Sequence, residues 1–207
     1  MATDDTTPLQ VRLATADDLS EVVQTLVEAF ANDPVWSWGF PDAEARAAQH
    51  TVIFGMMVGH AIATDSVWVT PGFDAIVTAF APGVNELSEE EAARLPEVFD
   101  ELLGEHASGI MGLFDRFDEA RPTDTPHVYI SLLGVRNRAR GQGLGMALLD
   151  EVLKRADAAG LGVYLESSNN ANDRRYERLG FELVGSVPVA EGRPPVSTMW
   201  RDARGAV

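Results

Sequence analysis

Apolar residues follow one another almost without interruption over residues 127–135, which is typical of a strand whose two faces are both covered. Residues 143–159 then have helical periodicity, and residues 162–167 have the composition of another strand. A strand, a helix and a second strand in this order predict a right-handed crossover, which makes the two strands parallel neighbours. We expect this pair to form the centre of the sheet.

The N-terminal part of the chain has the spacing of two helices and three short strands. Thr15 and the acids after it are typical of a helix start, Asn32-Asp33-Pro34 of a helix end, and Pro71-Gly72 of a hairpin turn. The expected elements are a strand at 11–14, a helix from 15 to about 31, a helix from about 42 to 63, and hairpin strands at 66–70 and 74–80.

The rest of the chain adds helices and one more hairpin. Ser88 and the three glutamates after it form a capping-box signal for an acidic helix toward Gly104, and residues 121–126 are rich in turn formers. A helix over 170–179 and a closing hairpin of 181–185 with 196–200 complete the pattern. Because antiparallel hairpins flank a parallel pair, the expected fold class is α/β, with a mixed central sheet flanked by helices.

The composition narrows the classes of protein. The 207 residues are enough for one domain with a substantial core, which we place at 10–202 after a flexible N-terminus at 1–9. Lys and Arg number 16 and Asp and Glu 32, so the net charge is −16. This charge argues against a nucleic-acid or anionic-membrane partner and suits a cationic amine. Cysteine is absent, which excludes thiol nucleophiles and disulfides.

Location and metal content follow from the same kind of evidence. The N-terminus has neither the basic start nor the apolar centre of a secretion signal, and the most apolar run, residues 51–63, is too short to cross a bilayer. We therefore expect a cytoplasmic enzyme or binding domain. The four histidines do not have the spacing of metal ligands, so no metal is expected.

Residues 136–145, RNRARGQGLG, combine arginines and alternating glycines between the buried strand and a helix start. The first N–H groups of a helix have no partner within it, and glycines let the backbone close around a large oxyanion, so a phosphate or pyrophosphate site is predicted. A P-loop is excluded because the chain has no Gly-Lys pair. A dinucleotide fingerprint lacks its third glycine, since Met146 or Leu148 stands there, although Glu166 lies about twenty residues further on, as a ribose-binding acid would. That alternative stays open, as does a glycine turn without a ligand.

Two motifs, in the right order, resemble those of the GNAT superfamily of acyl-CoA-dependent N-acyltransferases. The first is RGQGLG at 140–145, of the form [QR]-x-x-G-x-[GA]; the second is LESSN at 165–169, followed by Asn172 and YERLGF at 176–181. Within the superfamily the chain is most similar to the puromycin N-acetyltransferases, loosely from residue 11 to 201, whereas residues 84–126 match poorly. The resemblance implies a GNAT fold, in which the parallel strands ending at 135 and 167 splay apart.

The resemblance also implies that the chain binds acetyl-CoA as its cosubstrate. The pantetheine arm would lie along the open edge of strand 127–135 like an extra strand, and the glycine loop would hold the pyrophosphate. The substrate amine would attack directly, with no protein nucleophile, and a backbone N–H would stabilise the oxyanion of the tetrahedral intermediate. The residues expected to bind the cofactor are Leu133, Gly134, Val135, Arg138, Arg140, Gly141, Gln142, Gly143, Leu144, Gly145, Asn169, Asn172 and Tyr176.

Tyr176 is the expected general acid for the departing thiolate. Asn169, Asn172 and Tyr176 are spaced i, i+3 and i+7 and would share one helix face, and the pKa of a phenol lies within a unit or two of that of a thiol. Some members of the family carry a glutamate on the central strand where this chain has Tyr129, so Glu166 on the adjoining strand is the best remaining carboxylate for the base. The alternatives are a packing role for Tyr176 and a structural partner for Glu166.

The acceptor is expected to bind near the break between the first two helices. Phe30, Trp36 and Trp38, together with Tyr129, would wall a pocket for an amine with an aromatic or apolar body, the alternative being plain core packing. The expected function is acetyl transfer to the primary amine of a small molecule, such as an aminonucleoside or another amine antibiotic, by a monomer or homodimer. Antibiotic resistance would then be a role. A protein N-terminal or lysine acetyltransferase and a non-catalytic acetyl-CoA-binding module remain alternatives.

Overall fold

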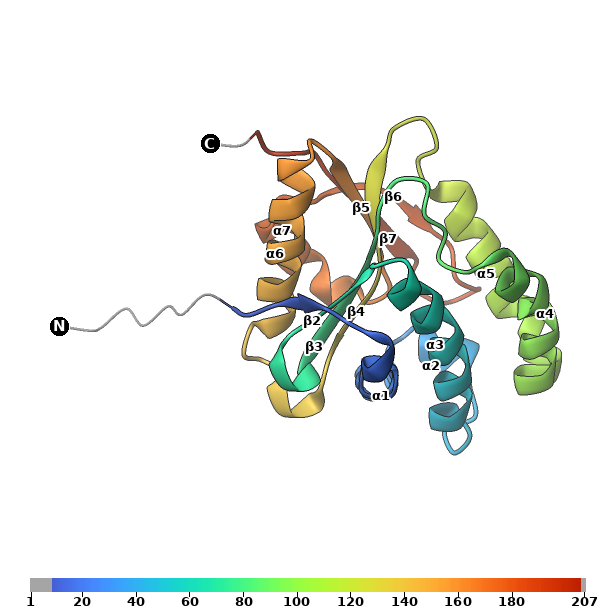
Figure 1. Ribbon diagram of the computed structural model, residues 1–207. Coiled ribbons are helices and arrows are strands. Elements are labelled where there is room, and N and C mark those ends of the chain that lie inside the picture. The colour runs from blue at the N-terminus through green and yellow to red at the C-terminus, as the bar shows by residue number, and fades with distance from the viewer. Residues whose placement is uncertain (1–8, 206–207) are drawn as a thin grey trace.

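The computed structural model describes residues 9–205 and is built on a seven-stranded sheet with the order β1-β2-β3-β4-β5-β7-β6 (Figure 1). Neighbouring strands are antiparallel except β4 and β5, which are parallel, so the predicted mixed sheet is confirmed. The strands are β1 Arg12–Leu13, β2 Val67–Val69, β3 Ala75–Phe80, β4 His127–Val135, β5 Gly162–Ser167, β6 Glu182–Val187 and β7 Val196–Arg201. The flexible N-terminus predicted for 1–9 lies, apart from residue 9, outside the described residues.

Helices cover both faces of this sheet (Figure 1). One face packs against α6 and α7, and the other against the remaining helices, which gives the protein two separate hydrophobic clusters. The helices are α1 Leu19–Phe30, α2 Trp36–Gly39, α3 Arg46–Ala63, α4 Glu89–Leu103, α5 Ala107–Ala120, α6 Leu144–Ala158 and α7 Asp173–Arg178. Among the residues described, no helix combines the length and the apolar character that crossing a membrane requires.

Strands β4 and β5 separate toward their C-terminal ends. They pair only from His127↔Gly162 to Ile130↔Leu165, although β4 continues to Val135 along β3. The predicted splay is therefore present. An irregularity in the β3–β4 register lies opposite it, where the Leu132 N–H donates to the side chain of Thr78 (2.8 Å) instead of to a β3 carbonyl.

The structure corrects several predicted elements. Helix α5 was not predicted, and α2 lies in a segment expected to be irregular. The helix expected at 170–179 is a 3₁₀ turn at Asn170–Asn172 followed by the shorter α7. The closing hairpin exists, but its second strand, β7, lies between β5 and β6. For the helix at 170–179 and the closing hairpin, the local pattern was identified correctly, while the length of the helix and the neighbours of β7 depended on tertiary packing.

His50 on α3 is a buried ionisable group in the core. Its side chain is fully buried among Trp36, Phe40 and Phe54, with ring centroids 5.4, 4.9 and 5.2 Å away, and neither ring nitrogen has a hydrogen-bond partner among the described residues. Burial, assisted by the charge of Arg46, lowers the pKa of His50 to about 4. The imidazole is therefore neutral in the folded protein near neutral pH.

His50 should make the protein sensitive to mild acid. Between pH 6.5 and 4 the unfolded chain binds a proton on this residue that the folded chain does not, so stability falls as the pH drops through this window. Urea titrations at pH 7 and pH 4.5 measure how much unfolding free energy each protein loses between these values. We expect this loss to be smaller in His50→Phe than in the parent, by on the order of 2 to 3 kcal/mol. The exposed His106→Gln is the control and should follow the parent. Equal losses in the parent and His50→Phe would contradict this account.

Candidate functional site

The glycine loop and the start of α6 form a positively polarised corner at the end of β4. Gly141 and Gly143 have φ of 80° and 79°, a backbone conformation that side chains with a Cβ rarely adopt. Gly143 is the N-cap of α6, and no side chain caps this helix end. The first N–H groups of α6 have no intrahelical partner, so they are available to an anion.

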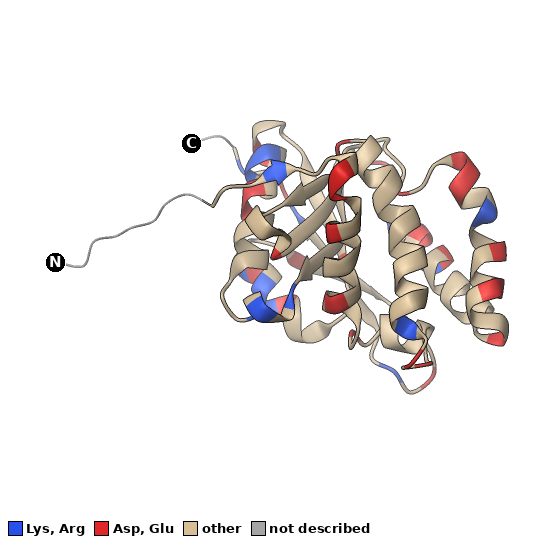
Figure 2. Cartoon of the chain, turned by 60° about the horizontal axis from the view of Figure 1, so that its bottom comes forward, with Lys and Arg blue, Asp and Glu red and all other residues tan. Residues whose placement is uncertain are grey.

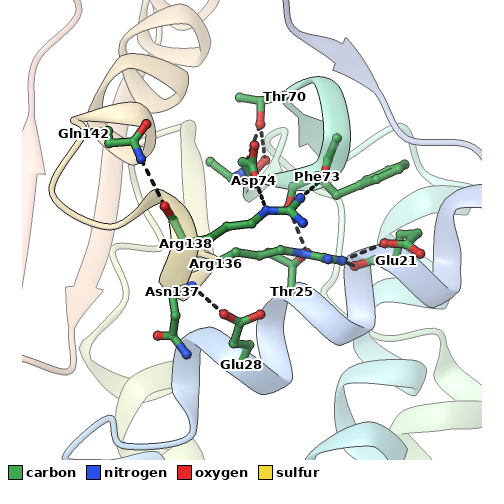
Figure 3. Close-up of polar contacts among 12 residues, drawn as sticks. Glu21, Thr25, Glu28, Thr70, Phe73, Asp74, Arg136, Asn137, Arg138 and Gln142 are labelled. Carbon is green, nitrogen blue, oxygen red and sulfur yellow. Dashed lines mark hydrogen bonds and ion pairs between the residues drawn. The ribbon is translucent and has the colours of Figure 1, made fainter.

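The loop arginines contact protein groups. Figure 3 shows Arg136 and Arg138 directed toward acidic and hydroxyl groups of α1 and of the β2–β3 turn. The contacts are Arg136 Nε to Thr25 Oγ1 (2.9 Å) and Nη2 to Glu21 Oε2 (2.7 Å), Arg138 Nε to Asp74 Oδ1 (2.6 Å), and Arg140 Nη2 to the Ala29 carbonyl (2.7 Å). The guanidinium groups predicted to bind phosphate thus fasten the loop to α1 and to the turn. The unpaired backbone N–H groups at the start of α6 are therefore the candidate anion ligands with no other partner within the helix.

Two other glycines allow helices to approach β4 closely. A Cβ on Gly145 would lie 2.7 Å from Val135 Cγ2, so glycine is needed for α6 to start against the strand. A Cβ on Gly134 would lie 3.2 Å from both Leu26 and Ala29 of α1. Both residues were predicted to bind the cofactor, and in the structure each allows close packing against β4.

The open edge of β4 presents main-chain groups of Leu133 and Val135. The Arg136 N–H donates to the Asp74 carbonyl on the β3 side (2.9 Å), and alternate residues of a strand direct their main-chain groups to the same side. Leu133 and Val135 therefore face away from β3, into the gap left by β5, whereas Gly134 faces β3. An extended ligand has two residues of β4 available for pairing.

Tyr176 lies on α7, on the α6 side of the sheet. Its ring packs edge-on against Phe181 at 5.9 Å between centroids and belongs to the cluster around α6. Burial, with the charges of Asp173 and Asp33, raises the pKa of Tyr176 to about 12. The difference between the pKa of Tyr176 and that of a thiol is thus larger than the unit or two expected for a free phenol. The hydroxyl nevertheless stays protonated at neutral pH.

Asn169, Asn172 and Tyr176 do not lie on one continuous helix, because a 3₁₀ turn at Asn170–Asn172 precedes α7. Asn169 precedes the 3₁₀ turn and caps it, since its Oδ1 accepts from the Ala171 N–H (3.1 Å). Asn172 Oδ1 accepts from Arg175 Nη1 (2.9 Å). The predicted i, i+3, i+7 face required a continuous helix, and the turn interrupts it.

On the opposite face of the sheet lies a pocket of about 400 Å³. Its floor is formed by β4 and β5 where they separate, and its walls come from the helices of that face and from residues 85–89. Phe30, Trp36 and Tyr129 line it as predicted, whereas Trp38 does not and packs against Gly109 of α5. The other lining residues are Val35, Ile53, Met57, Asn85, Glu86, Leu87, Ser88, Glu89, Ala92, Leu95, Phe114, Phe117, Asp118, Arg121, Ser131, Leu132, Glu166, Ser168 and Val196.

A buried polar cluster lies in this pocket. Arg121 Nη2 donates to Glu86 Oε2 (3.0 Å), and the guanidinium carbon lies 3.6 Å from the centroid of the Tyr129 ring. The Ser131 hydroxyl donates to the other oxygen of Glu86. Oε1 of Glu166 is buried without a hydrogen-bond partner among the described residues. Burial raises the pKa of Glu166 to about 7 even though the charge of Arg121 opposes this effect.

Glu86, Arg121 and the aromatic residues of α5 were not predicted from the sequence. They lie in the segment 84–126, which carries neither of the two family motifs, and a salt bridge between residues 35 positions apart leaves no local pattern. The helix itself was detectable, because Ile110, Leu113 and Phe117 recur at spacings of three and four. That spacing predicts a helix with one apolar face and says nothing of a pocket.

Comparisons with known proteins agree with this geometry. An L-methionine sulfoximine/L-methionine sulfone acetyltransferase of Pseudomonas paraeruginosa is 40% identical over 91 residues, which are 42% of this chain and 48% of that protein. The chain thus spans about half the length of this curated relative. A structure from Corynebacterium glutamicum described as histone acetyltransferase HPA2 and related acetyltransferase has a TM-score of 0.71 and 26% identity, covering 97% of this chain and 99% of the other.

The fold has further relatives, and a family model covers the site. The Drosophila melanogaster polyamine N-acetyltransferase has a TM-score of 0.66 at 18% identity over 94% of this chain and 99% of the other, which is evidence for the fold alone. The model of the acetyltransferase (GNAT) family matches residues 77–181, just over half of the chain, from β3 through the glycine loop to the end of α7. The chain therefore belongs to the acetyltransferase (GNAT) family.

Proposed function

We propose that the protein is an acetyl-CoA-dependent N-acetyltransferase whose acceptor is a primary amine of a small molecule. The observation that carries this proposal is the meeting of two features at the β4–β5 splay. A backbone anion site and an open strand edge lie toward α6, and an acidic, apolar pocket lies on the other face. The gap between the strands is the place where a donor held on one side and an acceptor held on the other would meet.

The residues present fit acetyl-CoA, which would supply an activated acetyl thioester. Gly141, Gly143 and the first N–H groups of α6 would hold the pyrophosphate, since a Cβ built on either glycine meets no protein atom within 4 Å. Main-chain groups of Leu133 and Val135 would pair with the pantetheine amides, and one of these N–H groups would stabilise negative charge on the reacting carbonyl oxygen. Tyr176 would hold a proton for the departing thiol sulfur.

Glu166 would remove the proton of the ammonium group. Its free Oε1 belongs to a side chain that lines the pocket floor beside the splay, so an amine bound there would have a carboxylate acceptor next to it. A carboxyl whose pKa is near 7 is a more effective base than one with an ordinary pKa, because it is both ionised and basic at neutral pH.

This role predicts an acidic limb in the pH profile. The pKa of Glu166 is raised, so the carboxylate is lost as the pH falls through about 7, and kcat/KM for the amine should drop by about tenfold per pH unit below that value. Glu166→Gln should be slower and should lack this limb. Steady-state rates from pH 5.5 to 9 for both proteins would measure it. A limb near pH 7 that persists in Glu166→Gln would assign the titration to another group.

The apolar and aromatic lining of the pocket suits a small acceptor. Its walls of Phe30, Trp36, Phe114 and Phe117 would accommodate an aromatic or apolar body, such as that of an aminonucleoside or another amine antibiotic. The similarity to puromycin N-acetyltransferases and the role in antibiotic resistance stay predictions, as does the state of monomer or homodimer. The name of the Pseudomonas relative makes an amino acid derivative a second kind of compound to test as an acceptor.

A thiol-release screen tests the proposed function. The protein would be mixed with acetyl-CoA and a library of amines that includes puromycin, L-methionine sulfone and a lysine peptide. Release of free CoA with at least one small amine, and formation of its N-acetyl product by mass spectrometry, is the expected result. Release with the peptide alone would favour a protein acetyltransferase. Tight acetyl-CoA binding without release with any amine would favour a non-catalytic module.

A further inference from the structure

The pocket has more acidic than basic residues in its lining. Four carboxylates line it, those of Glu86, Glu89, Asp118 and Glu166, while Arg121 is the single Lys or Arg among the described residues that line it. Helix α4, which forms one wall, adds to this charge because it begins with three consecutive glutamates (Figure 2). A cation is therefore favoured in the pocket and an anion is disfavoured.

The guanidinium group of Arg121 already pairs with carboxylates of the protein. One terminal nitrogen lies 3.0 Å from Glu86 Oε2 and 3.5 Å from Asp118 Oδ1, and the guanidinium plane rests on Tyr129. Glu86 is fixed in turn by the Ser131 hydroxyl. The Nε of Arg121 is buried without a partner, which leaves a donor for one neutral oxygen atom. A charge shared between two carboxylates does not provide a separate site for a third.

Glu166, unlike Arg121, forms no salt bridge among those described. Its Oε1 is buried without a hydrogen-bond partner among the described residues, although the hydroxyls of Tyr129 and Tyr164 lie near the carboxyl group. Because these neighbours are neutral and Glu166 lines the pocket, its carboxylate is the one left for a ligand ammonium group. Phe30, Trp36, Phe114 and Phe117 line the same pocket, and aromatic side chains suit both a cation and an apolar body.

We infer that the pocket selects primary amines that carry an apolar or aromatic body and no carboxylate, and that Glu86 enforces this selection by occupying Arg121. The inference rests on the proposed function and narrows its acceptor. An α-amino acid would bring a carboxylate within a few bonds of its ammonium group and place it beside Glu166 and Glu86. That anion would be desolvated among like charges with no free cation to pair with.

A matched pair of acceptors tests the inference without any mutation. 2-Phenylethylamine and L-phenylalanine differ only by the carboxylate, so their ratio of kcat/KM measures its effect. We expect the amine to be preferred by about 100-fold or more, the size of effect that an unpaired desolvated charge produces. L-Methionine sulfone, assayed beside them, should be as poor as L-phenylalanine.

Glu86→Gln identifies the residue responsible. The substitution keeps the shape of the side chain and releases one of the two carboxylates that hold Arg121, so the guanidinium becomes available to the carboxylate of an amino acid. The preference should shrink by about tenfold, mainly through a lower KM for L-phenylalanine. Glu89→Gln is the matched control, because it removes the same charge from the pocket wall and Glu89 has no contact with Arg121 among those described. Glu89→Gln should leave the ratio of kcat/KM for 2-phenylethylamine to that for L-phenylalanine near the parental value.

The outcomes separate the inference from the proposed function. Equal kcat/KM for 2-phenylethylamine and L-phenylalanine in the parent, or efficient acetylation of L-methionine sulfone, would overturn the inference and leave the proposed function standing. An unchanged ratio in a folded Glu86→Gln would overturn the role of Glu86. Absence of thiol release with every amine would overturn the proposed function, and the inference with it.

Discussion

Tyr176→Phe is expected to lower kcat by about 10²- to 10⁴-fold while leaving acetyl-CoA affinity and stability little changed, if the hydroxyl protonates the departing thiolate. The phenylalanine keeps the edge-on contact with Phe181 and the packing against the α6 cluster, so only the hydroxyl is lost. The loss should appear in kcat more than in KM because the proton is needed only when the thioester bond breaks.

The raised pKa of Tyr176 also predicts how the rate depends on pH. A phenol with a pKa of about 12 is protonated throughout the working pH range, so the proton is present, and no basic limb from this residue should appear below pH 10. Single-turnover measurement of the acetyl-transfer step is required, since slow product release would conceal a chemical defect. A variant that transfers acetyl at the parental single-turnover rate would make Tyr176 a packing residue, with water or another group as the acid.

The central crossover was predictable because its signals are local. A continuous apolar run, two glycines of positive φ and a helical period define β4, the loop and α6 within about thirty residues. The same holds for the capping box of Ser88 and Glu91, which the structure shows with both of its hydrogen bonds. The conformation of such elements depends little on contacts with the rest of the chain.

The acceptor pocket was not predictable in the same way. Arg121 and Tyr129 are close in the sequence, but Glu86 lies 35 positions before Arg121, and the packing of the chain brings the three together. Trp36 and Trp38 illustrate the limit: two tryptophans separated by one residue were both predicted to line a pocket. The short helix α2 directs Trp36 into the pocket and Trp38 toward Gly109.

The two sides of the site use different kinds of group. The anion site relies on backbone N–H groups at a helix start, which depend on the conformation of two glycines and hardly on side-chain identity. The proposed acceptor pocket relies instead on side chains from several helices and from β4 and β5. This separation would let the acceptor change while the donor site is retained.

Gly143→Val should weaken acetyl-CoA binding by on the order of 100-fold or more. At φ of 79° a β-branched residue is strained by roughly 1–3 kcal/mol, and its relaxation would turn the first N–H groups of α6 away from the pyrophosphate. The added side chain would also occupy the open space in front of the loop, where no protein atom lies within 4 Å of the built Cβ and where the phosphate would lie. Titration calorimetry with acetyl-CoA measures the loss.

Gly160→Val is the matched control for this change. Gly160 follows the other end of the same helix, has a φ of 69° and likewise has no atom within 4 Å of a built Cβ, so the substitution imposes the same kind of strain away from the loop. Both variants should lose similar stability, and only Gly143→Val should lose affinity. If a folded Gly143→Val binds acetyl-CoA as the parent does, the loop does not hold the pyrophosphate, and binding of NADH by the parent would then support the dinucleotide alternative.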